Sequence, residues 1–262
     1  MKVVLYANCQ AGGLAHFLKK RMPVQCEVFH NYQLILGEQK PDDLRRATKD
    51  CDWFIYQPTD SDRHGELASG ALLELLPPHA QSLSFAYQFN TGFFPLVELG
   101  DLMGSEHMPE EYWTIGRNDL SALYDQWRID FGFLERFQRC LEEQYWREHL
   151  CVHDSGFENS LRTYKWIIDN SHQELFLNHN HPASALFAEL ARQAAEKMTG
   201  KPQEPIPFTS ENEAELPCCM PVSAYTIREY GWKRDPHEAA HERYREMLLK
   251  VWDYRRTGSA KV

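Results

Sequence analysis

The chain has 262 residues, of which 43% are hydrophobic and 13% aromatic, which is enough for a sizeable core and argues against intrinsic disorder. The net charge of −10, from 28 basic and 38 acidic side chains, argues against a general nucleic-acid or membrane-surface binder. No run of about 18 apolar residues occurs, so no membrane-spanning helix is expected. The first residues lack the order of a signal peptide, and seven cysteines, an odd number, favour free thiols. We therefore expect a cytoplasmic protein.

Four short apolar runs alternate with helical patterns in the first 90 residues. The runs that predict strands are Val3–Ala7, Cys26–Phe29, Trp53–Tyr56 and Leu83–Tyr87. The patterns that predict helices between them are Leu14–Arg21, Pro41–Lys49 and Leu67–Leu76. Such alternation is typical of βαβ units. It predicts an α/β fold in which helices flank a parallel sheet in a flavodoxin-like, three-layer arrangement.

The pattern changes from residue 110 to residue 170, where aromatic and charged residues mix at helical spacing. We interpret this stretch as a helical insertion packed beside the sheet. Glu174–Leu177 then predicts a last short strand, and Pro182–Thr199 predicts a helix with Pro182 in its first turn. Residues 201–262 form a C-terminal extension that ends in an amphipathic helix, Pro236–Arg256. The length favours a single domain over residues 1–262.

Polar clusters follow the predicted strands. They are Asn8–Gln10, Gln57–Asp60, Gln88–Gly92 and Asn178–Pro182. Ligands of open parallel sheets bind at the carboxyl ends of the strands. If the sheet is continuous, all four clusters line one cleft.

Cys9 stands between the first strand and the first helix. Unpaired N–H groups and the positive dipole end of a helix favour a thiolate there, and a thiolate near His181 is a competent nucleophile. The backbone N–H groups of Gln10 or Ala11 are candidates to hold a developing oxyanion. The side chains of Gln10, Gln57 and Asn90 are candidates to assist them. The alternative is that Cys9 is only a small residue at a tight turn.

His181 is the candidate base. Asn178, three residues earlier, can hydrogen-bond the imidazole and fix its tautomer, which is the orienting role of the acidic member of a triad. The alternative is a histidine that only caps the following helix. His179 is the rival candidate, and we expect it to face away, because neighbouring strand positions point in opposite directions.

Four motifs together resemble the WcbI family of polysaccharide-biosynthesis proteins, regarded as coenzyme-A-dependent acetyltransferases. The motifs are NCQ at 8–10, YQP at 56–58, FNTGFFP at 89–95 and HNHPASALFAELA at 179–191. The layout also resembles, more distantly, SGNH hydrolases, in which a serine follows the first strand and Asp-x-x-His-Pro opens the final helix. Cys9 stands at that serine position and His181 at that histidine position. Asn178 replaces the usual aspartate, and a neutral amide cannot stabilise an imidazolium as a carboxylate does.

The family resemblance implies acetyl-CoA as donor substrate and a sugar hydroxyl of a glycan as acceptor. Gly12 and Gly13 are candidates to let the donor approach the backbone closely. The candidate cations for the phosphates of coenzyme A are Lys19, Lys20, Arg63, Arg117, Arg162 and Lys165. The aromatic-rich helices at 112–166 are candidates for an apolar wall along the pantetheine arm.

Several alternatives stay open at this stage. Cys9 either takes the acetyl group as a thioester, or only lines the site while His181 activates the acceptor for direct attack. The same residues also suit an esterase or thioesterase, or a non-catalytic module that binds coenzyme A or a nucleotide. His149, Cys151, His153 and Asp154 are metal-ligand types, but these four residues have neither CxxC nor HExxH spacing. We therefore expect no functional metal.

Overall fold

The computed structural model describes residues 1–90, 114–125, 133–173, 175–205, 245–246, 249–250 and 252–253. The chain divides into two compact units. The first unit comprises Met1–Gln88, Glu143–Ile168 and Ser184–Phe208, and the second comprises Phe89–Glu142, Asp169–Ala183 and Thr209–Val262. The single domain expected over residues 1–262 stays a prediction. No helix in the described ranges is both long and apolar enough to cross a membrane.

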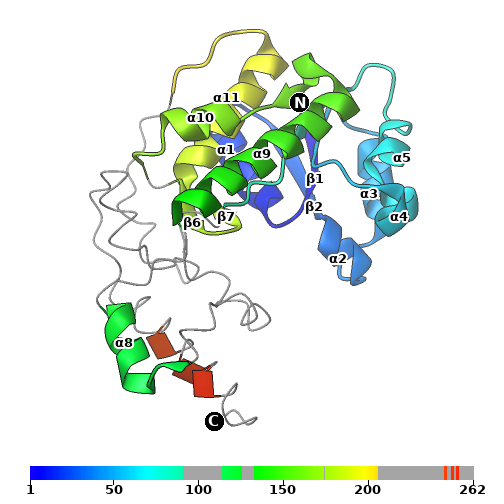
Figure 1. Ribbon diagram of the computed structural model, residues 1–262. Helices are drawn as coiled ribbons and strands as arrows, with labels where there is room; N and C mark the ends of the chain where they lie inside the picture. The colour runs from blue at the N-terminus through cyan, green and yellow to red at the C-terminus, as the bar shows by residue number, and fades with distance from the viewer. Residues whose placement is uncertain are drawn as a thin grey trace. The chain divides into compact units, whose positions relative to one another are not determined.

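Five parallel strands form the sheet of the first unit, in the order β2-β1-β3-β4-β5 (Figure 1). The strands are β1 (Lys2–Ala7), β2 (Gln25–His30), β3 (Trp53–Tyr56), β4 (Gln81–Phe85) and β5 (Ser160–Leu161). Leu5 of β1 lies opposite Val28 of β2 and Ile55 of β3. The structure therefore confirms the predicted α/β fold with a parallel sheet. The strand order reverses between β1 and β3, which is where such sheets bind ligands.

Helices connect and cover these strands (Figure 1). In chain order they include α1 (Gln10–Arg21), α2 (Asn31–Ile35), α3 (Pro41–Thr48), α4 (Ser61–His64), α5 (Ser69–Leu73), α9 (Phe133–Ser155), α10 (Tyr164–Asp169) and α11 (Ser184–Thr199), with short 3-10 turns at Gly65–Leu67 and Phe157–Asn159. Helix α8 (Arg117–Asp125) belongs to the second unit. Proline fits the first turn of α3, where its missing N–H costs nothing, and Asp42 and Asp43 complement the helix dipole there. Gly200, at φ 65°, follows the end of α11.

Each face of the sheet of the first unit packs against its own core. Because successive side chains of a strand point in opposite directions, alternate residues of a strand enter different cores. Val3 and Leu5 belong to a core formed with the buried residues of α1 and α11. Val4 and Tyr6 belong to a second core, formed with residues of α2, α3 and α5, including Leu44. These two cores explain the continuous apolar character of Val3–Ala7, and they hold the carboxyl ends of the strands in place.

The structure corrects two predicted elements. The predicted last strand, Glu174–Leu177, corresponds to β6 (Phe176–Asn178), which pairs antiparallel with β7 (His181–Pro182) in a separate sheet. The fifth strand of the main sheet is instead β5, inside the predicted helical insertion. Two residues are too few to show a periodicity, which is why no sequence pattern predicted β5.

The helix predicted at Pro182–Thr199 begins two residues later, at Ser184, because Pro182 lies in β7. The insertion predicted at 110–170 does contain the helices α8, α9 and α10. The C-terminal extension predicted at 201–262 lies almost wholly outside the described residues. Within its predicted helix, residues 245–246, 249–250 and 252–253 are described and are helical.

Candidate functional site

Asn8, at the carboxyl end of β1, accepts hydrogen bonds from the first residues of helix α1, whose N-cap residue is Cys9. The side-chain Oδ1 of Asn8 accepts a hydrogen bond from Gln10 N at 3.0 Å, and its carbonyl oxygen accepts one from Ala11 N at 3.1 Å. These are the two N–H groups that the sequence predicted for an oxyanion. In this arrangement both already donate to Asn8, so an oxyanion would have to replace a capping bond. The backbone N–H of Asn8 donates to Gln57 Oε1 at 3.1 Å, which ties this turn to the end of β3.

Cys9 is the exposed thiol of the described residues. Cys26 is half-buried, and Cys51, Cys140 and Cys151 are buried. Partial desolvation raises the pKa of the Cys9 thiol, and a hydrogen bond with its own backbone N–H opposes the shift. This shift favours the thiol, whereas the sequence predicted that the helix N-terminus favours the thiolate. A base or the bound substrate must therefore remove the proton of the Cys9 thiol before it can react.

We expect an alkylating reagent such as iodoacetamide to label Cys9 well before Cys51 and Cys151, because the latter are buried and their pKa values are raised to about 11 and about 12. Since the pKa of Cys9 is raised too, its labelling rate should keep climbing with pH past 9. Peptide mass spectrometry over a pH series measures both. A rate that levels off near pH 7 would show an activated thiolate and contradict this assignment.

Three buried glutamines join the ends of β1, β3 and β4. Gln10 Nε2 donates to the carbonyl oxygen of Gln88 at 2.7 Å, and Gln10 Oε1 accepts from Gln88 N at 3.0 Å. Gln57 Nε2 donates to the same Gln10 Oε1 at 3.1 Å. All three are at most 5% exposed. The side chain of Gln10 therefore works inside the protein as a clamp between strand ends, and its predicted part in an oxyanion site stays a prediction.

The polar network continues from Gln88 to the end of β5 and helix α9. Thr163 Oγ1 donates toward Gln88 Oε1 at 2.9 Å and toward Glu148 Oε1 at 2.8 Å. The same Glu148 oxygen accepts the backbone N–H groups of Thr163 at 2.5 Å and Tyr164 at 2.7 Å. Burial raises the pKa of the Glu148 carboxyl, and these hydrogen bonds partly oppose the shift. Glu148 thus anchors the strand after α9 to the glutamine network.

In the second unit, Asn178 and His181 have the geometry that the sequence predicted. Asn178 Oδ1 accepts the backbone N–H groups of Asn180 at 3.0 Å and His181 at 2.9 Å, which identifies this atom as oxygen. The His181 Nδ1 lies 3.0 Å from that oxygen and 2.6 Å from Asn180 Oδ1. Between two acceptors, Nδ1 must carry the proton, so Nε2 is the basic nitrogen. Burial lowers the pKa of His181, which keeps the ring neutral at pH 7.

Replacing Asn178 by Asp should raise the pKa of His181, because a carboxylate at the same distance favours the imidazolium. The introduced carboxylate can still accept the two backbone N–H groups, so the loop should keep its shape. We expect an increase of about 1 unit or more in an NMR titration of the His181 ring. Asn170→Asp, at a half-buried position of the same unit, is the control. An unchanged His181 pKa would mean that the ring does not use the Asn178 oxygen.

The second unit also holds Asn90 and His179. The N–H of Asn90 donates to the carbonyl oxygen of His179 at 2.8 Å, and Asn90 is 2% exposed. The His179 ring packs edge-on against Phe89, with ring centroids 5.3 Å apart. His179 therefore has an aromatic neighbour of its own, and the prediction that it does not act as the base stays a prediction.

Cys9 lies in the first unit and His181 lies in the second, so their pairing stays a prediction. The same holds for a cleft shared by all four polar clusters. The structure does bring Gln10 and Gln57 together in one unit, and Asn178 and His181 in the other. Within each unit, residues predicted at strand ends do lie together, and their functional roles stay predictions.

The residues predicted to bind coenzyme A lie in different surroundings. Gly13 of α1 packs against Phe187 of α11, and a Cβ there would come within 2.5 to 2.8 Å of that ring, so close helix packing already accounts for this glycine. A Cβ at Gly12 would meet open space.

The cations predicted for the phosphates of coenzyme A are also spread over the chain. The Arg162 guanidinium lies over the Phe157 ring at 3.6 Å, and Lys165 is exposed on α10. Arg117, in the second unit, pairs with Asp253 at 3.4 Å. Their predicted contacts with the donor stay predictions.

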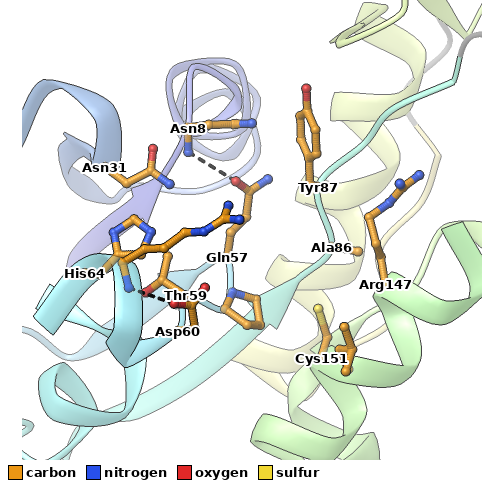
Figure 2. Close-up of a pocket in the computed structure, with 13 residues that line it drawn as sticks. Asn8, Asn31, Gln57, Thr59, Asp60, His64, Ala86, Tyr87, Arg147 and Cys151 are labelled. Carbon is orange, nitrogen blue, oxygen red and sulfur yellow. Dashed lines mark hydrogen bonds between the residues drawn. The ribbon is translucent and has the colours of Figure 1, made fainter. Parts of the chain in front are cut away.

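A pocket of about 350 Å³ opens at the carboxyl ends of the strands, at the β1/β3 reversal (Figure 2). Figure 2 shows Gln57 between two walls, with Asn31 and His64 on one side and Tyr87, Arg147 and Cys151 on the other. Its remaining lining residues are Asn8, Pro58, Thr59, Asp60, Arg63, Ala86 and Leu150. We call it the switch-point pocket. All its residues belong to the first unit.

Sequence reasoning missed part of this pocket. Asn31 follows β2, so the strand-end rule that singled out Asn8 and Gln57 applies to it as well. Arg147 carries no comparable signal, because it is one of many charged residues on α9. Only the packing of α9 beside the strand ends makes it a pocket residue.

Comparisons with known proteins agree with this architecture. Residues 2–111 match the family described as polysaccharide biosynthesis enzyme WcbI, which confirms the resemblance that the motifs predicted. A solved structure of WcbI, described as a novel polysaccharide biosynthesis enzyme, is similar at a TM-score of 0.68 and 20% identity, over 97% of this chain and 90% of that chain. It is described as the native protein without a disulfide bond between coenzyme A and one of its cysteines. No curated protein sequence matches the chain.

Proposed function

We propose that the protein transfers an acetyl group from acetyl-CoA to a sugar hydroxyl in polysaccharide biosynthesis. The observation that carries the proposal is the position of Cys9. It is an exposed thiol at the carboxyl end of β1, where the strand order reverses, and it directly follows a residue of the switch-point pocket. The match of residues 2–111 to a family of polysaccharide biosynthesis enzymes supports the pathway.

Coenzyme A is the expected donor because the solved WcbI protein is described by reference to a disulfide between coenzyme A and a cysteine. A cysteine can form that bond only where the thiol end of the pantetheine arm reaches it. Among the described cysteines of this chain, Cys9 is the exposed one. We therefore assign the thioester end of acetyl-CoA to the surroundings of Cys9.

His181 is the proposed general base. Its pKa is lowered, so the ring is neutral at pH 7, and the hydrogen bonds of Nδ1 leave the lone pair on Nε2. A neutral imidazole held in one tautomer can accept a proton from a thiol or a hydroxyl. The proposal requires that Nε2 face Cys9 or the acceptor when substrates are bound.

Two reaction paths use these groups. In the covalent path the Cys9 sulfur, its proton taken by His181, attacks the thioester carbonyl. The C–S bond to coenzyme A breaks, and the protonated His181 gives its proton to the departing coenzyme A thiolate, which returns the imidazole to its neutral form. The sugar hydroxyl then attacks the acetyl-Cys9 carbonyl, gives its proton to His181, and expels the Cys9 thiolate. In the direct path His181 takes the hydroxyl proton while the sugar oxygen attacks acetyl-CoA itself, and coenzyme A leaves as the thiolate.

The test uses acetyl-CoA labelled in its acetyl group, with a mixture of neutral and acidic saccharides as acceptors. Acetylated saccharide, detected by mass spectrometry, supports the proposal. Label on Cys9 after rapid quenching identifies the covalent path, and its absence with continued turnover identifies the direct path. Cys26→Ala is the control for Cys9→Ala, since Cys26 is half-buried on β2.

Two other outcomes would overturn the proposed transfer. Release of free acetate at the same rate with and without saccharides would show a thioesterase. Binding of acetyl-CoA with no turnover under any condition would show a binding module.

A further inference from the structure

The switch-point pocket presents hydrogen-bond donors. The amide oxygens of three lining side chains are used inside the protein: Asn8 Oδ1 accepts Gln10 N, Asn31 Oδ1 accepts Tyr32 N at 2.8 Å, and Gln57 Oε1 accepts Asn8 N. Within the described residues the NH₂ groups of Asn8 and Asn31 donate to no protein atom. The amide groups therefore offer N–H donors, and they favour a ligand rich in oxygen acceptors.

Cationic side chains add to this donor-rich wall. Arg63 and Arg147 line the pocket, and the backbone N–H and the charge of Arg63 help to lower the pKa of the neighbouring Asp60 carboxyl. Arg147 contacts Glu143 at 3.5 Å through Nη1 and donates from Nη2 to Gln144 Oε1 at 3.2 Å, so a ligand oxyanion would share this guanidinium with protein acceptors. His64 Nδ1 is buried without a hydrogen-bond partner in the described structure. The lining carboxylate, Asp60, uses Oδ1 to cap α4. In a chain of net charge −10, such a pocket selects an anionic ligand.

The walls of the pocket are held in place before any ligand binds. Thr59 and Ser69 exchange hydrogen bonds, from Thr59 N to Ser69 Oγ at 3.2 Å and from Ser69 N to Thr59 Oγ1 at 2.9 Å. Asp60 accepts Arg63 N at 2.9 Å in the next turn. A pre-organised loop binds without a large loss of conformational entropy.

The size and the apolar atoms of the pocket narrow the class of ligand. A volume of about 350 Å³ is at the small end for ligand sites, and it suits one sugar ring with a substituent. A whole molecule of coenzyme A is too large to be enclosed there. Tyr87 and Leu150 provide apolar surface on the side of Arg147, which suits the C–H face of a sugar ring.

We propose that the switch-point pocket is the acceptor subsite and that it takes a saccharide carrying an oxyanion, either a carboxylate or a phosphate. Arg63 and Arg147 bind the oxyanion, and the NH₂ groups of Asn8 and Asn31 bind hydroxyl oxygens. The inference deepens the proposed function, on which it rests, because Asn8 directly precedes Cys9 and brings a sugar hydroxyl toward the site of transfer.

Calorimetric titration of the full chain tests the subsite with D-glucuronate, glucose 1-phosphate and D-glucose as probes. We expect at least one of the anionic sugars to bind about tenfold or more tightly than glucose, because charge-assisted hydrogen bonds are the strong ones. Arg63→Gln and Arg147→Gln should each weaken that binding about tenfold or more. Arg46→Gln, which removes the same charge from an exposed position of α3, should leave it unchanged. If Arg147→Gln does not fold, the same titrations are made with Arg147→Lys and with Arg63→Gln, which changes an exposed residue.

Three results would overturn the subsite. The first is equal affinity for glucose and both anionic sugars, and the second is an affinity for the anionic sugar that Arg63→Gln does not change. The third is an equal loss of affinity for coenzyme A in Arg63→Gln and Arg147→Gln. The last would assign the pocket to the phosphates of the donor. Saccharide binding in Cys9→Ser separates this inference from the proposed function. If wild-type protein binds the anionic sugar through Arg63 but never transfers acetyl groups, the subsite stands and the transferase proposal fails.

Discussion

Replacing His181 by Ala should lower acetyl transfer by about 10² to 10⁴-fold, the range that general acid–base catalysis contributes. The reason is the fixed tautomer, since Nδ1 is held between the oxygens of Asn178 and Asn180 and Nε2 is left as the basic atom. Either reaction path needs this atom to remove a proton. Initial rates with labelled acetyl-CoA measure the loss, and the affinity for coenzyme A should change little.

Two histidines of the same unit serve as comparisons for this variant. His172 is exposed, and His172→Ala should keep the wild-type rate. His179→Ala removes the ring that packs against Phe89, so we expect a mild effect through local packing. A larger loss in His179→Ala than in His181→Ala would show that the base is misassigned. The activity of the wild type should also fall only below pH 6.5, because burial lowers the pKa of His181 from that value.

Replacing Glu148 by Ala should destabilise the fold by about 3 kcal/mol or more, since each buried donor left without a partner costs about 1–3 kcal/mol. One oxygen of Glu148 accepts the backbone N–H groups of Thr163 and Tyr164 and contacts the Thr163 hydroxyl. The carboxylate is 6% exposed, so water cannot replace it without opening the structure. Urea unfolding followed by circular dichroism measures the difference.

Glu148→Gln keeps an oxygen acceptor and should cost much less than Glu148→Ala. Glu142→Ala, at an exposed position of the same helix, should stay within about 0.5 kcal/mol of wild type. Burial raises the folded-state pKa of Glu148 above 4.5, so folding favours the protonated form. This contribution to stability is complete below pH 4.5 and is lost as the pH rises through the folded pKa. A loss in Glu148→Ala no larger than in Glu142→Ala would refute the anchoring role.

The elements of the first 90 residues could be predicted because β1, β3 and β4 are largely buried runs and β2 carries a short apolar signal of its own. Trp53–Tyr56 is apolar at every position, since both faces of β3 are covered, and its predicted bounds agree with the structure. Pro41 and its neighbouring acids marked the start of α3 equally well. Local sequence determines these elements, and the α/β class follows from their alternation.

The site could be predicted only in part, because its chemistry depends on contacts between residues that are far apart in the sequence. Asn178 and His181 are three residues apart, so their hydrogen bond could be predicted from spacing. The bonds of Gln10 with Gln57 and Gln88 span 47 and 78 positions, and nothing local distinguishes a clamp from an oxyanion donor. The raised pKa of Cys9 likewise comes from partial desolvation, which outweighs the hydrogen bond with its own backbone N–H.

The central claim is that the thiol end of coenzyme A reaches Cys9. It is tested most directly by incubating the protein with the symmetric disulfide of coenzyme A and locating the adduct by peptide mass spectrometry. Thiol–disulfide exchange would join one coenzyme A to the protein and release the other as the free thiol. We expect the adduct on Cys9, its loss in Cys9→Ser, and protection by acetyl-CoA. An adduct confined to Cys26, or one on Cys9 that excess acetyl-CoA fails to prevent, would contradict the account.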